Sequence, residues 1–304
     1  MSNFFIIVFC LIVGFLFKKF NLANKNDYKI VNTWVIYVGL PSIALLHIPT
    51  IEWSLRYIFT ASLPILIFGI SYLFFNFINR WLHYSKRTIT TLIIVSGLSN
   101  TSFVGFPLII SFFGSEQLKI GIVSDQVTFF TLSTLGVLLA TSSKSVFSSK
   151  QEKVRFIVRR LVTFPPFLAC VLALLFHSYL RSEETSLFLN ALAATVSPLA
   201  LFSIGMQLQF KNIKKELSSI SISLLYKLLL APMLAVGLAL FLGFKGIFYQ
   251  VSVFEMAMPC LVASSMIIEK FGLNVKLSNT IIGLSIIVGL IISFLWYSVI
   301  YTLL

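Results

Sequence analysis

The chain has 304 residues, of which 58% are hydrophobic and only 11% are charged, and its mean hydropathy is +0.97. A soluble domain has about 25% charged residues, so this composition excludes an ordinary soluble protein and predicts a polytopic membrane protein. The net charge of +13 does not indicate a nucleic-acid partner, because the Lys and Arg residues fall in short loops between apolar runs.

Apolar runs of about 20 residues, the length that crosses the hydrocarbon core, recur along the whole chain. They predict ten transmembrane helices, at 2–20, 29–48, 57–79, 88–113, 120–142, 156–180, 187–208, 217–242, 247–269 and 278–303. The longest polar stretch is read as a basic linker at 143–155. The first run lacks a basic region before it and a cleavage site after it, so we expect a retained helix rather than a signal peptide.

The fourth span carries helix breakers and hydrogen-bonding side chains at its centre, within the sequence IVSGLSNTSFVGFPLIISFFG. The predicted helix-breaking residues here are Gly97, Gly105 and Pro107, and the predicted substrate-binding residues are Ser99, Asn100 and Thr101. An unpaired backbone group in lipid costs several kcal/mol, so such a sequence survives only where protein or a water-filled cavity surrounds it. The alternative for Asn100 and Thr101 is structural hydrogen bonding to a neighbouring helix.

Three ionisable residues fall inside apolar spans: Asp125 in span five, Lys227 in span eight and Glu255 in span nine. Each costs about 2.5–3.5 kcal/mol or more at a helix centre, so we expect them to face the interior as a charge relay for coupling. Lys227 is predicted to neutralise Asp125, Glu255 or an acidic group of the substrate. For the two acids, a position at the membrane interface is the alternative.

Five spans, a linker and five further spans are the pattern that an internal duplication would leave, and an odd number of spans makes the two copies inverted. Pro41 in span two and Pro198 in span seven are separated by nearly the same distance in sequence as Gly114 and Gly272, which end spans four and nine. The same spacing sets the broken centre of span four against Pro259 of span nine. Interrupted segments in corresponding positions point to the binding site of a secondary transporter.

Half-helix N-termini at such a crossing carry partial positive charge and free N–H groups, which favour an anion. We therefore predict a substrate-binding set of Ser99, Asn100, Thr101, Pro259, Cys260 and Pro41, with Pro198 as a further helix breaker. Plain kinks are the alternative for Pro41 and Pro198. No metal ligands and no resident cofactor are predicted.

Orientation follows from the loops, because cytoplasmic loops hold the excess of Lys and Arg. The loops after odd-numbered spans are rich in both, whereas the loops after even-numbered spans hold only Arg56, Lys119, Arg181 and Lys245. This distribution predicts that both termini lie outside.

The motif SNTSFVGFPLI at 99–109 resembles the fourth-helix motif of the auxin efflux carrier family, which has bacterial members. LFSIGMQL, YKLLLAPML and AMPCLVASSMIIEKFG resemble its seventh, eighth and ninth helices, so the similarity covers all ten spans. The family includes the plant auxin carriers and shares an NhaA-like or bile-acid-symporter-like fold. The resemblance implies an all-α polytopic membrane protein with two inverted five-helix repeats, 1–142 and 156–304, whose helices four and nine are broken and cross.

The resemblance also implies a scaffold domain of helices 1, 2, 6 and 7 and a mobile transport domain of helices 3–5 and 8–10. Asn100 matches the crossover Asn that contacts the substrate carboxylate, and Pro259 matches the ninth-helix crossover Pro. Ser99 stands where plant carriers have Pro, Cys260 where they have Gln, and their large cytoplasmic insertion is missing. The substrate therefore cannot be taken as auxin.

The predicted function is secondary transport of a small organic anion, such as a mono- or dicarboxylate, across a bacterial inner membrane by an elevator-type carrier. A channel or passive pore on the same fold is the alternative. An intramembrane enzyme is not expected, because no HExxH, GxSxG or Gly-x-Gly-Asp motif is present. A primary pump is excluded, because there is no phosphate-binding Gly-rich loop with Lys. Coupling to H⁺ or Na⁺ is left open, as is a homodimer through the scaffold domain, and no nucleic-acid partner is predicted.

Overall fold

The computed structural model of the chain describes residues 2–24, 26–143, 147, 149–176, 180, 182–207 and 216–304. Over these residues the protein is helical, with one isolated β-bridge and no strand, so the predicted all-helical class is confirmed. The α-helices are α1 (Ser2–Lys19), α2 (Tyr28–Trp34), α3 (Leu40–His47), α4 (Arg56–Leu82), α5 (Lys86–Ser96), α6 (Phe106–Phe112), α7 (Leu118–Thr131), α8 (Val137–Ser143), α9 (Lys150–Val162), α10 (Pro165–Leu175), α11 (Glu183–Ala193), α12 (Val196–Gln207), α13 (Leu217–Leu225), α14 (Ala231–Phe241), α15 (Ile247–Met256), α16 (Ser264–Lys270) and α17 (Val275–Leu303).

Short segments of tighter or wider helix join several of these elements. Four are π-helical, namely η1 (Val35–Gly39), η3 (Thr101–Gly105), η5 (Leu132–Gly136) and η8 (Tyr226–Leu230), and two are 3-10 turns, η2 (Ile48–Thr50) and η4 (Ser115–Gln117). Because η1, η5 and η8 each lie between two α-helices without a break, the predicted spans two, five and eight are continuous helices.

Six helical segments of the described chain are long and apolar enough to cross a membrane: Tyr28–Thr50, Arg56–Leu82, Ser115–Ser142, Glu183–Gln207, Leu217–Phe241 and Val275–Leu303. A seventh is present if α9 and α10, which are bent by 61° at the break between them, form one span. The bend falls at Pro165, which begins α10, because the residue before a proline is disfavoured in helical conformation. The predicted spans at 88–113 and 247–269 are interrupted, and the count of ten spans stays a prediction.

The linker predicted at 143–155 is helical in its second half, because α9 begins at Lys150. Its basic residue Lys144 lies outside the described residues, as do five further Lys and Arg residues of the predicted loops: Lys25, Arg181, Lys211, Lys214 and Lys215.

The predicted helix breakers behave differently from one another. Gly97 does end α5, and a Cβ there would lie 2.4 Å from Ser71 Oγ of α4, so only glycine allows this close approach. The backbone stays helical through Gly105 and Pro107, which stand at the start of α6, and through Pro198 in the first turn of α12. Gly105 and Pro107 therefore lie inside the helical run that begins with η3, whereas Pro198 stands in a first turn, where its missing N–H is not needed.

The chain divides into two compact units. Unit 1 contains Met1–Ser54, Ser102–Ile122 and Arg160–Leu208, and unit 2 contains Leu55–Thr101, Val123–Arg159 and Gln209–Leu304. In unit 1, α1 packs along α12, and α3 packs against α10 and α11. The Trp34 indole donates to Thr195 Oγ1 at 3.0 Å, which ties α2 to the turn before α12.

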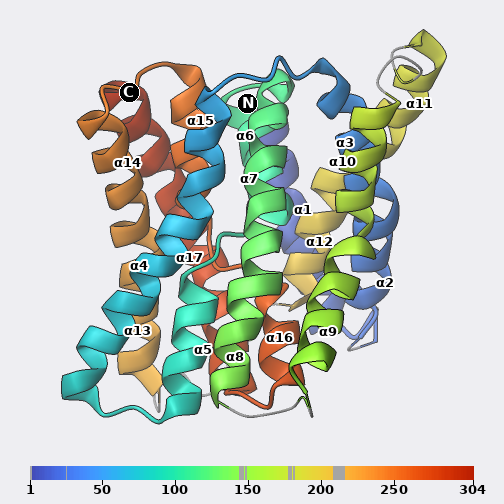
Figure 1. Cartoon of the computed structure of the whole chain (residues 1–304). Coiled ribbons are helices and arrows are strands. Elements are labelled where there is room, and N and C mark those ends of the chain that lie inside the picture. The colour runs from blue at the N-terminus through green and yellow to red at the C-terminus, as the bar shows by residue number, and fades with distance from the viewer. Residues whose placement is uncertain are drawn as a thin grey trace. The chain divides into compact units, whose positions relative to one another are not determined.

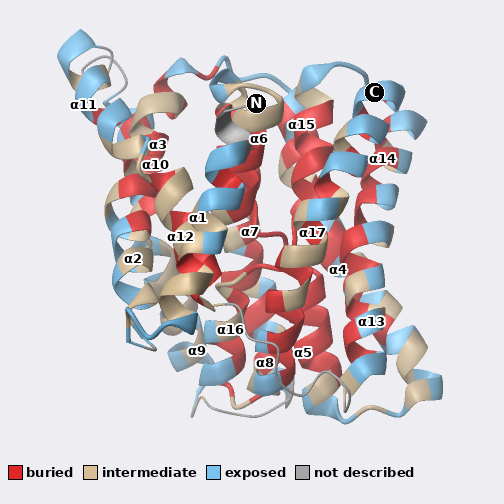
Figure 2. Ribbon diagram, turned by 180° about the vertical axis from the view of Figure 1, so that it is seen from behind, coloured by how far each residue is buried: buried red, intermediate tan, exposed pale blue. Residues whose placement is uncertain are grey.

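In unit 2, helices α4, α5, α13, α15 and α17 pack against one another, with blue and cyan helices beside orange and red ones in Figure 1. Their contacts include buried hydroxyl pairs, Ser96 with Ser223 at 2.5 Å and Thr60 with Ser252 at 2.6 Å. Helix association in lipid depends on such close packing of small residues and hydrogen bonds between helices. Figure 2 shows that the buried residues concentrate on the inward faces of these helices.

The contact between α1 and α12 depends on two glycines. A Cβ on Gly14 would lie 2.0 Å from the Phe202 carbonyl oxygen, and one on Gly205 would lie 2.3 Å from that of Leu11. These atoms belong to backbone, which cannot move aside as a side chain tip can. The two helices therefore approach as closely as they do only because both positions lack a side chain.

We expect Gly14→Ala and Gly205→Ala each to destabilise the protein by about 1–3 kcal/mol, the usual cost of overpacking. Gly69→Ala and Gly237→Ala are matched controls in helices, because nothing lies within 4 Å of a Cβ at either position. Thermal unfolding in detergent, followed by tryptophan fluorescence, measures the effect. Equal unfolding temperatures for the two pairs of variants would contradict the close packing of α1 on α12.

Candidate functional site

The breaks in the fourth and ninth predicted spans meet within unit 2. After α5 ends, the Asn100 N–H donates to the Pro259 carbonyl at 2.8 Å, and the Leu261 N–H donates to the Leu98 carbonyl at 3.1 Å. These bonds form an antiparallel bridge between Ser99 and Cys260. Backbone groups freed by the breaks are thus paired with each other, which is what a non-helical segment inside a membrane protein requires.

Lys227 lies in η8 and reaches the place where the two broken segments meet, Leu98–Asn100 and Pro259–Leu261, which we call the crossing. Its ammonium donates to Ser99 Oγ at 2.6 Å and to the Met256 carbonyl at 3.0 Å. The side chain is fully buried. Met256 is the last residue of α15, and a cation is stabilising at a helix C-terminus, where the carbonyls lack partners. A single ammonium therefore ties both broken segments to the helix that continues as α14.

The sequence predicts that Lys227 neutralises an acid, but its hydrogen bonds go to a hydroxyl and a carbonyl. Glu255 receives no hydrogen bond from Lys227, since neither of its carboxylate oxygens has a hydrogen-bond partner. Asp125 and Lys227 nevertheless both act electrostatically on Glu255. The three ionisable groups thus lie in one cluster, although the ammonium bonds neutral oxygens rather than the Glu255 carboxyl group.

Asp125 lies in α7 and is connected to the residue that follows Asn100. The Thr101 hydroxyl donates to Asp125 Oδ1 at 2.5 Å, and the Gln126 side-chain amide lies 3.5 Å from Oδ2. Asp125 is 6% exposed and Glu255 is fully buried, so neither lies on the protein surface. The carboxylate of Asp125 therefore fixes the start of η3 against α7.

Several buried polar atoms at or near the crossing have no hydrogen-bond partner within the described chain. Both amide atoms of Asn100 and both carboxylate oxygens of Glu255 are among them. The hydroxyls of Ser124 and Thr128, which flank Asp125 on one side of α7, are unpartnered too. Buried polar groups are satisfied in the great majority of cases, and each exception needs an explanation. A polar ligand that takes up these donors and acceptors supplies one.

The ninth-span side of the crossing is positioned by α17. The Cys260 N–H donates to Ser285 Oγ at 3.1 Å, and Cys260 itself is buried and free. A Cβ on Gly289 would lie 3.1 Å from Pro259 Cβ, so the small residue lets Pro259 pack close to this helix. Cys260 and Pro259 are therefore held in place by backbone and packing contacts, and their side chains offer no strong hydrogen-bonding group.

The structure thus brings together Ser99, Asn100, Thr101, Asp125, Lys227, Glu255, Pro259 and Cys260, all in unit 2. Pro41 and Pro198 belong to unit 1, in α3 and α12. Near them in sequence, a Cβ on Gly39 would lie 2.4 Å from Val196 Cγ2, so η1 and α12 are in close contact there.

Sequence reasoning did not single out Ser124, Thr128, Ser285 or the Met256 carbonyl. The spacing of Ser124 and Thr128 around Asp125 was the available signal, because residues four apart share one helix face. The Ser285 hydroxyl and the Met256 carbonyl carry no such signal, since their role depends on which helices pack together.

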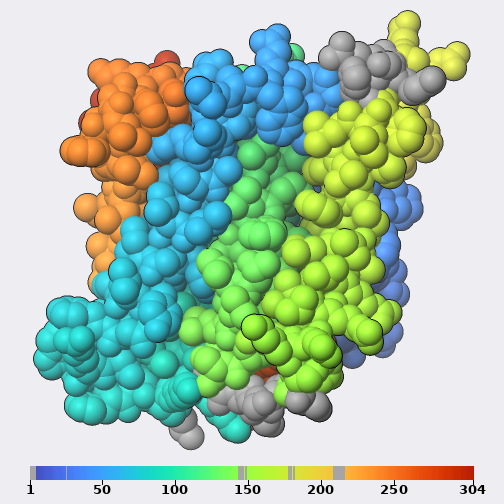
Figure 3. Space-filling model, in the orientation of Figure 1, coloured from blue at the N-terminus to red at the C-terminus, as the bar shows by residue number. Residues whose placement is uncertain are grey.

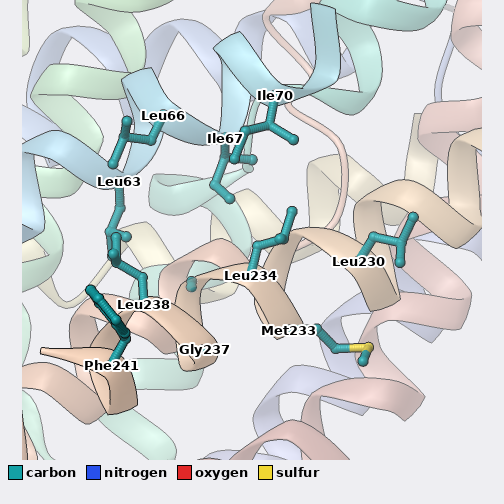
Figure 4. A pocket seen from close by; sticks show the side chains of 11 residues that line it. Leu63, Leu66, Ile67, Ile70, Leu230, Met233, Leu234, Gly237, Leu238 and Phe241 are labelled. Carbon is teal, nitrogen blue, oxygen red and sulfur yellow. The ribbon is translucent and has the colours of Figure 1, made fainter. Parts of the chain in front are cut away.

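A separate cavity of about 600 Å³ lies between α4 and α14 in unit 2 (Figure 4). It is lined by Leu63, Leu66, Ile67, Ile70, Leu230, Met233, Leu234, Ala235, Gly237, Leu238 and Phe241. These side chains contain no group that could hydrogen-bond an anion. The candidate functional site is therefore the polar crossing and not this apolar cavity.

The family model described as "Membrane transport protein" matches residues 1–297 of the chain. The chain belongs to this family. It is the auxin efflux carrier family that the four sequence motifs indicated, so that prediction is confirmed. Together with the apolar helices, this membership identifies the chain as an integral membrane protein of a transporter family.

Two archaeal relatives are similar to the chain over nearly their whole length. An uncharacterized transporter of Methanothermobacter thermautotrophicus is 26% identical over 292 residues, which cover 94% of this chain and 93% of the relative. An uncharacterized transporter of Methanocaldococcus jannaschii is 27% identical over 301 residues, which cover 96% of each chain. The similarity therefore includes both broken segments.

The contact between Lys227 and Ser99 predicts a measurable energetic coupling. A hydrogen bond to a charged group contributes about 1.5–3 kcal/mol, so we expect Ser99→Ala and Lys227→Met each to lower the free energy of unfolding. The double variant should cost less than the two single costs added together, because both remove the same bond. Denaturant unfolding of the four proteins in detergent measures this coupling.

Ser62→Ala, alone and combined with Lys227→Met, is the control for this comparison of single and double variants. The Ser62 hydroxyl bonds only the Phe59 carbonyl of its own helix, so its cost should add to that of Lys227→Met. Costs of Ser99→Ala and Lys227→Met that also add would show that the two side chains are not bonded.

Proposed function

We propose that the protein is a secondary transporter that carries a small organic anion, such as a mono- or dicarboxylate, by elevator-type alternating access. The observation that carries the proposal is the fully buried amide of Asn100, which has no hydrogen-bond partner and lies at the crossing of two broken helices. A carboxylate is a natural acceptor for the amide N–H₂. The predicted role for half-helix N-termini is not needed for this argument, since α6 and α16 are short.

Matching features in the two halves support an inverted repeat. Gly114 follows α6 and Gly272 follows α16, and both glycines have positive φ, 93° and 62°. The sequence spacing of these two glycines is close to that between Gly39 and Val196, and between Ser99 and Cys260, residue pairs that meet in space. Contacts between corresponding positions are expected where two related halves pack around a common axis. These contacts favour two repeats of five spans each, at 1–142 and 156–304.

The two compact units support an elevator mechanism in which one body moves and the other stays fixed. Unit 1 contains 1–54 and 160–208, which correspond to spans one, two, seven and most of span six, the predicted scaffold. Unit 2 contains the crossing residues together with spans three, eight and ten. The segment Ser102–Ile122 falls in unit 1, although the predicted transport domain includes it. We propose that unit 2 is the body that carries the substrate.

Charge balance at the crossing suggests that a monovalent cation travels with the anion. Asp125 and Glu255 against Lys227 leave one net negative charge when all three are ionised, and an anionic substrate adds to it. A buried charge without compensation costs several kcal/mol. A proton on a carboxylate or a Na⁺ ion would restore neutrality, and the unpartnered oxygens of Asn100, Ser124, Thr128 and Glu255 are the hard ligands that Na⁺ prefers.

We further propose that the protein lies in the cell membrane with both termini outside. The support is the excess of Lys and Arg in loops after odd-numbered spans. A homodimer through the scaffold domain remains part of the proposal. A channel would use the same crossing, and the kinetics of uptake distinguish it from a carrier.

Counterflow in liposomes tests the function. Purified protein is reconstituted into vesicles loaded with one unlabelled carboxylate, from acetate and lactate to malonate and succinate, and uptake of the same labelled compound is followed. A carrier gives transient accumulation above equilibrium, because influx of label exchanges with efflux of unlabelled substrate. Uptake that only equilibrates and does not saturate would identify a channel, and no uptake of any carboxylate would reject the proposed substrate class.

Asn100→Ala should weaken carboxylate binding about 10- to 150-fold, the value of an amide hydrogen bond to a charged acceptor. Asn100→Asp should weaken it further, because like charges repel strongly where water is excluded. Calorimetry on monodisperse protein measures both. Asn76→Ala is the control, since this exposed amide bonds only Tyr72 of its own helix. Unchanged affinity in both Asn100 variants would remove this residue from the site.

Glu255→Gln keeps the size of the side chain and removes its charge, so we expect stimulation of uptake by a proton or Na⁺ gradient to disappear. Exchange of substrate without a gradient should persist, because it needs no net movement of charge. Uptake into vesicles under each imposed gradient separates H⁺ from Na⁺. Glu255→Asp, which keeps the carboxylate, is the matched control. Full gradient stimulation in Glu255→Gln would exclude Glu255 as the coupling group.

A further inference from the structure

Helix α9 has a composition unlike that of the other helices. Its sequence, KQEKVRFIVRRLV, contains five basic residues and one acidic residue, and none of its residues is buried. At 13 residues it is too short to cross the hydrocarbon core, which needs about 20. The 61° bend before α10 also turns it away from the direction of the next apolar helix. Only together with α10 is it long enough to cross, so α9 is the basic, bent end of this segment.

The inner side of α9 is fixed to the end of α16. The Phe156 ring lies with its centroid 6.3 Å from that of Phe271, in an edge-to-face arrangement, and the Lys270 ammonium stands 3.6 Å above the Phe156 ring. Phe147 packs on both rings, at 5.4 Å from Phe156 and 5.8 Å from Phe271. Figures 1 and 2 both show α9 beside α16. Phe156 therefore marks the side of α9 that faces the protein.

Three exposed valines lie on the opposite side of α9. At about 3.6 residues per turn, Val154 and Val158 share the face that points away from Phe156. They are 52% and 50% exposed, and Val162 continues the same stripe at 50%. Lys150 and Arg155 flank this stripe, one on each side, and Lys153 stands closer to the Phe156 side. In Figure 3 the yellow-green atoms of this part of the chain lie at the visible surface.

We propose that α9 is a docking surface for anionic lipid headgroups, with its valine stripe inserted at the membrane interface and its basic edges bonded to phosphates. A basic helix with one apolar face lies in the interface plane, whereas a helix in water would gain nothing from an exposed valine stripe. The occupant is identified by charge and by the apolar stripe together: a soluble anion would satisfy the basic edges but leave the valines exposed. The proposal does not depend on which substrate is transported.

The basic groups set the expected size of the effect. A Lys or Arg near an anionic membrane surface contributes about 1 kcal/mol, which corresponds to about fivefold in binding. Replacing Lys150, Lys153 and Arg155 together should therefore weaken binding of an anionic lipid by about 100-fold. A lipid with a neutral zwitterionic headgroup should bind the original and the altered protein equally.

The experiment uses the full chain in detergent with added phosphatidylglycerol or phosphatidylcholine, and counts retained lipids by native mass spectrometry. We expect the protein to retain phosphatidylglycerol preferentially, and Lys150→Gln/Lys153→Gln/Arg155→Gln to lose this preference. The control Lys86→Gln/Arg87→Gln/Lys276→Gln removes the same charge from exposed positions outside α9. The proposal would be overturned if the control variant lost its preference for phosphatidylglycerol to the same extent. It would also be overturned if free glycerol phosphate displaced phosphatidylglycerol from the original protein, because a soluble anion would then suffice.

A second measurement holds even if the triple variant fails to fold. Nitroxide labels at Val158→Cys and Glu152→Cys, in protein without its native cysteines and reconstituted in vesicles with phosphatidylglycerol, report contact with lipid through oxygen accessibility. The label at 158 should be accessible to oxygen from the lipid and shielded from a water-soluble nickel complex, and the label at 152 should be the reverse. Equal exposure of both labels to the nickel complex would show that α9 lies in water.

Discussion

The constraint on which the rest of this structure depends is that backbone polar groups cannot remain unpaired inside a membrane protein. Two helices stop in the middle of apolar sequence, and each break frees N–H and carbonyl groups. The bonds from Asn100 to Pro259 and from Leu261 to Leu98 pair these groups with one another. Two breaks at the same place are thus stable where a single break would be costly. The crossing also leaves side chains, rather than backbone, available for a ligand.

A charged side chain, Lys227, also connects the two broken segments. Its ammonium bonds the Met256 carbonyl at the C-terminal end of α15 and Ser99 across the break, so a buried cation also holds the two broken segments together. The hydrogen bonds around Thr101 and Asp125 do the same for the start of η3. The side-chain amide of Asn100 and the carboxylate oxygens of Glu255, by contrast, have no hydrogen-bond partner in the described chain. They are therefore the atoms of the cluster that a ligand could bind.

Two π-helical segments, η3 and η8, lie at the site. Lys227 lies in η8, and η3 begins directly after Asn100. A π-helical turn shifts the face on which the following residues lie, and such turns occur often at functional sites. At Lys227, the shift is accompanied by the Tyr226 hydroxyl bonding the Ile67 carbonyl at 2.6 Å, and by the Trp296 indole bonding the Leu228 carbonyl at 2.7 Å. These bonds use neighbouring helices to hold the turn in place.

The sequence by itself determined the helical membrane class, the family and the location of the two breaks. These features follow from local signals, which can be read without a structure: the length of the apolar runs, Gly97 before a polar segment, and Pro259 after Glu255. The sequence did not distinguish Gly97, which ends α5, from Gly105 and Pro107, which lie inside a helical run. Only the tertiary structure decided that Lys227 bonds Ser99 and the Met256 carbonyl, that Ser285 holds Cys260, and that Asn100 has no partner. Those facts depend on which helices lie side by side, and an apolar sequence of nearly uniform composition does not encode that choice in any single segment.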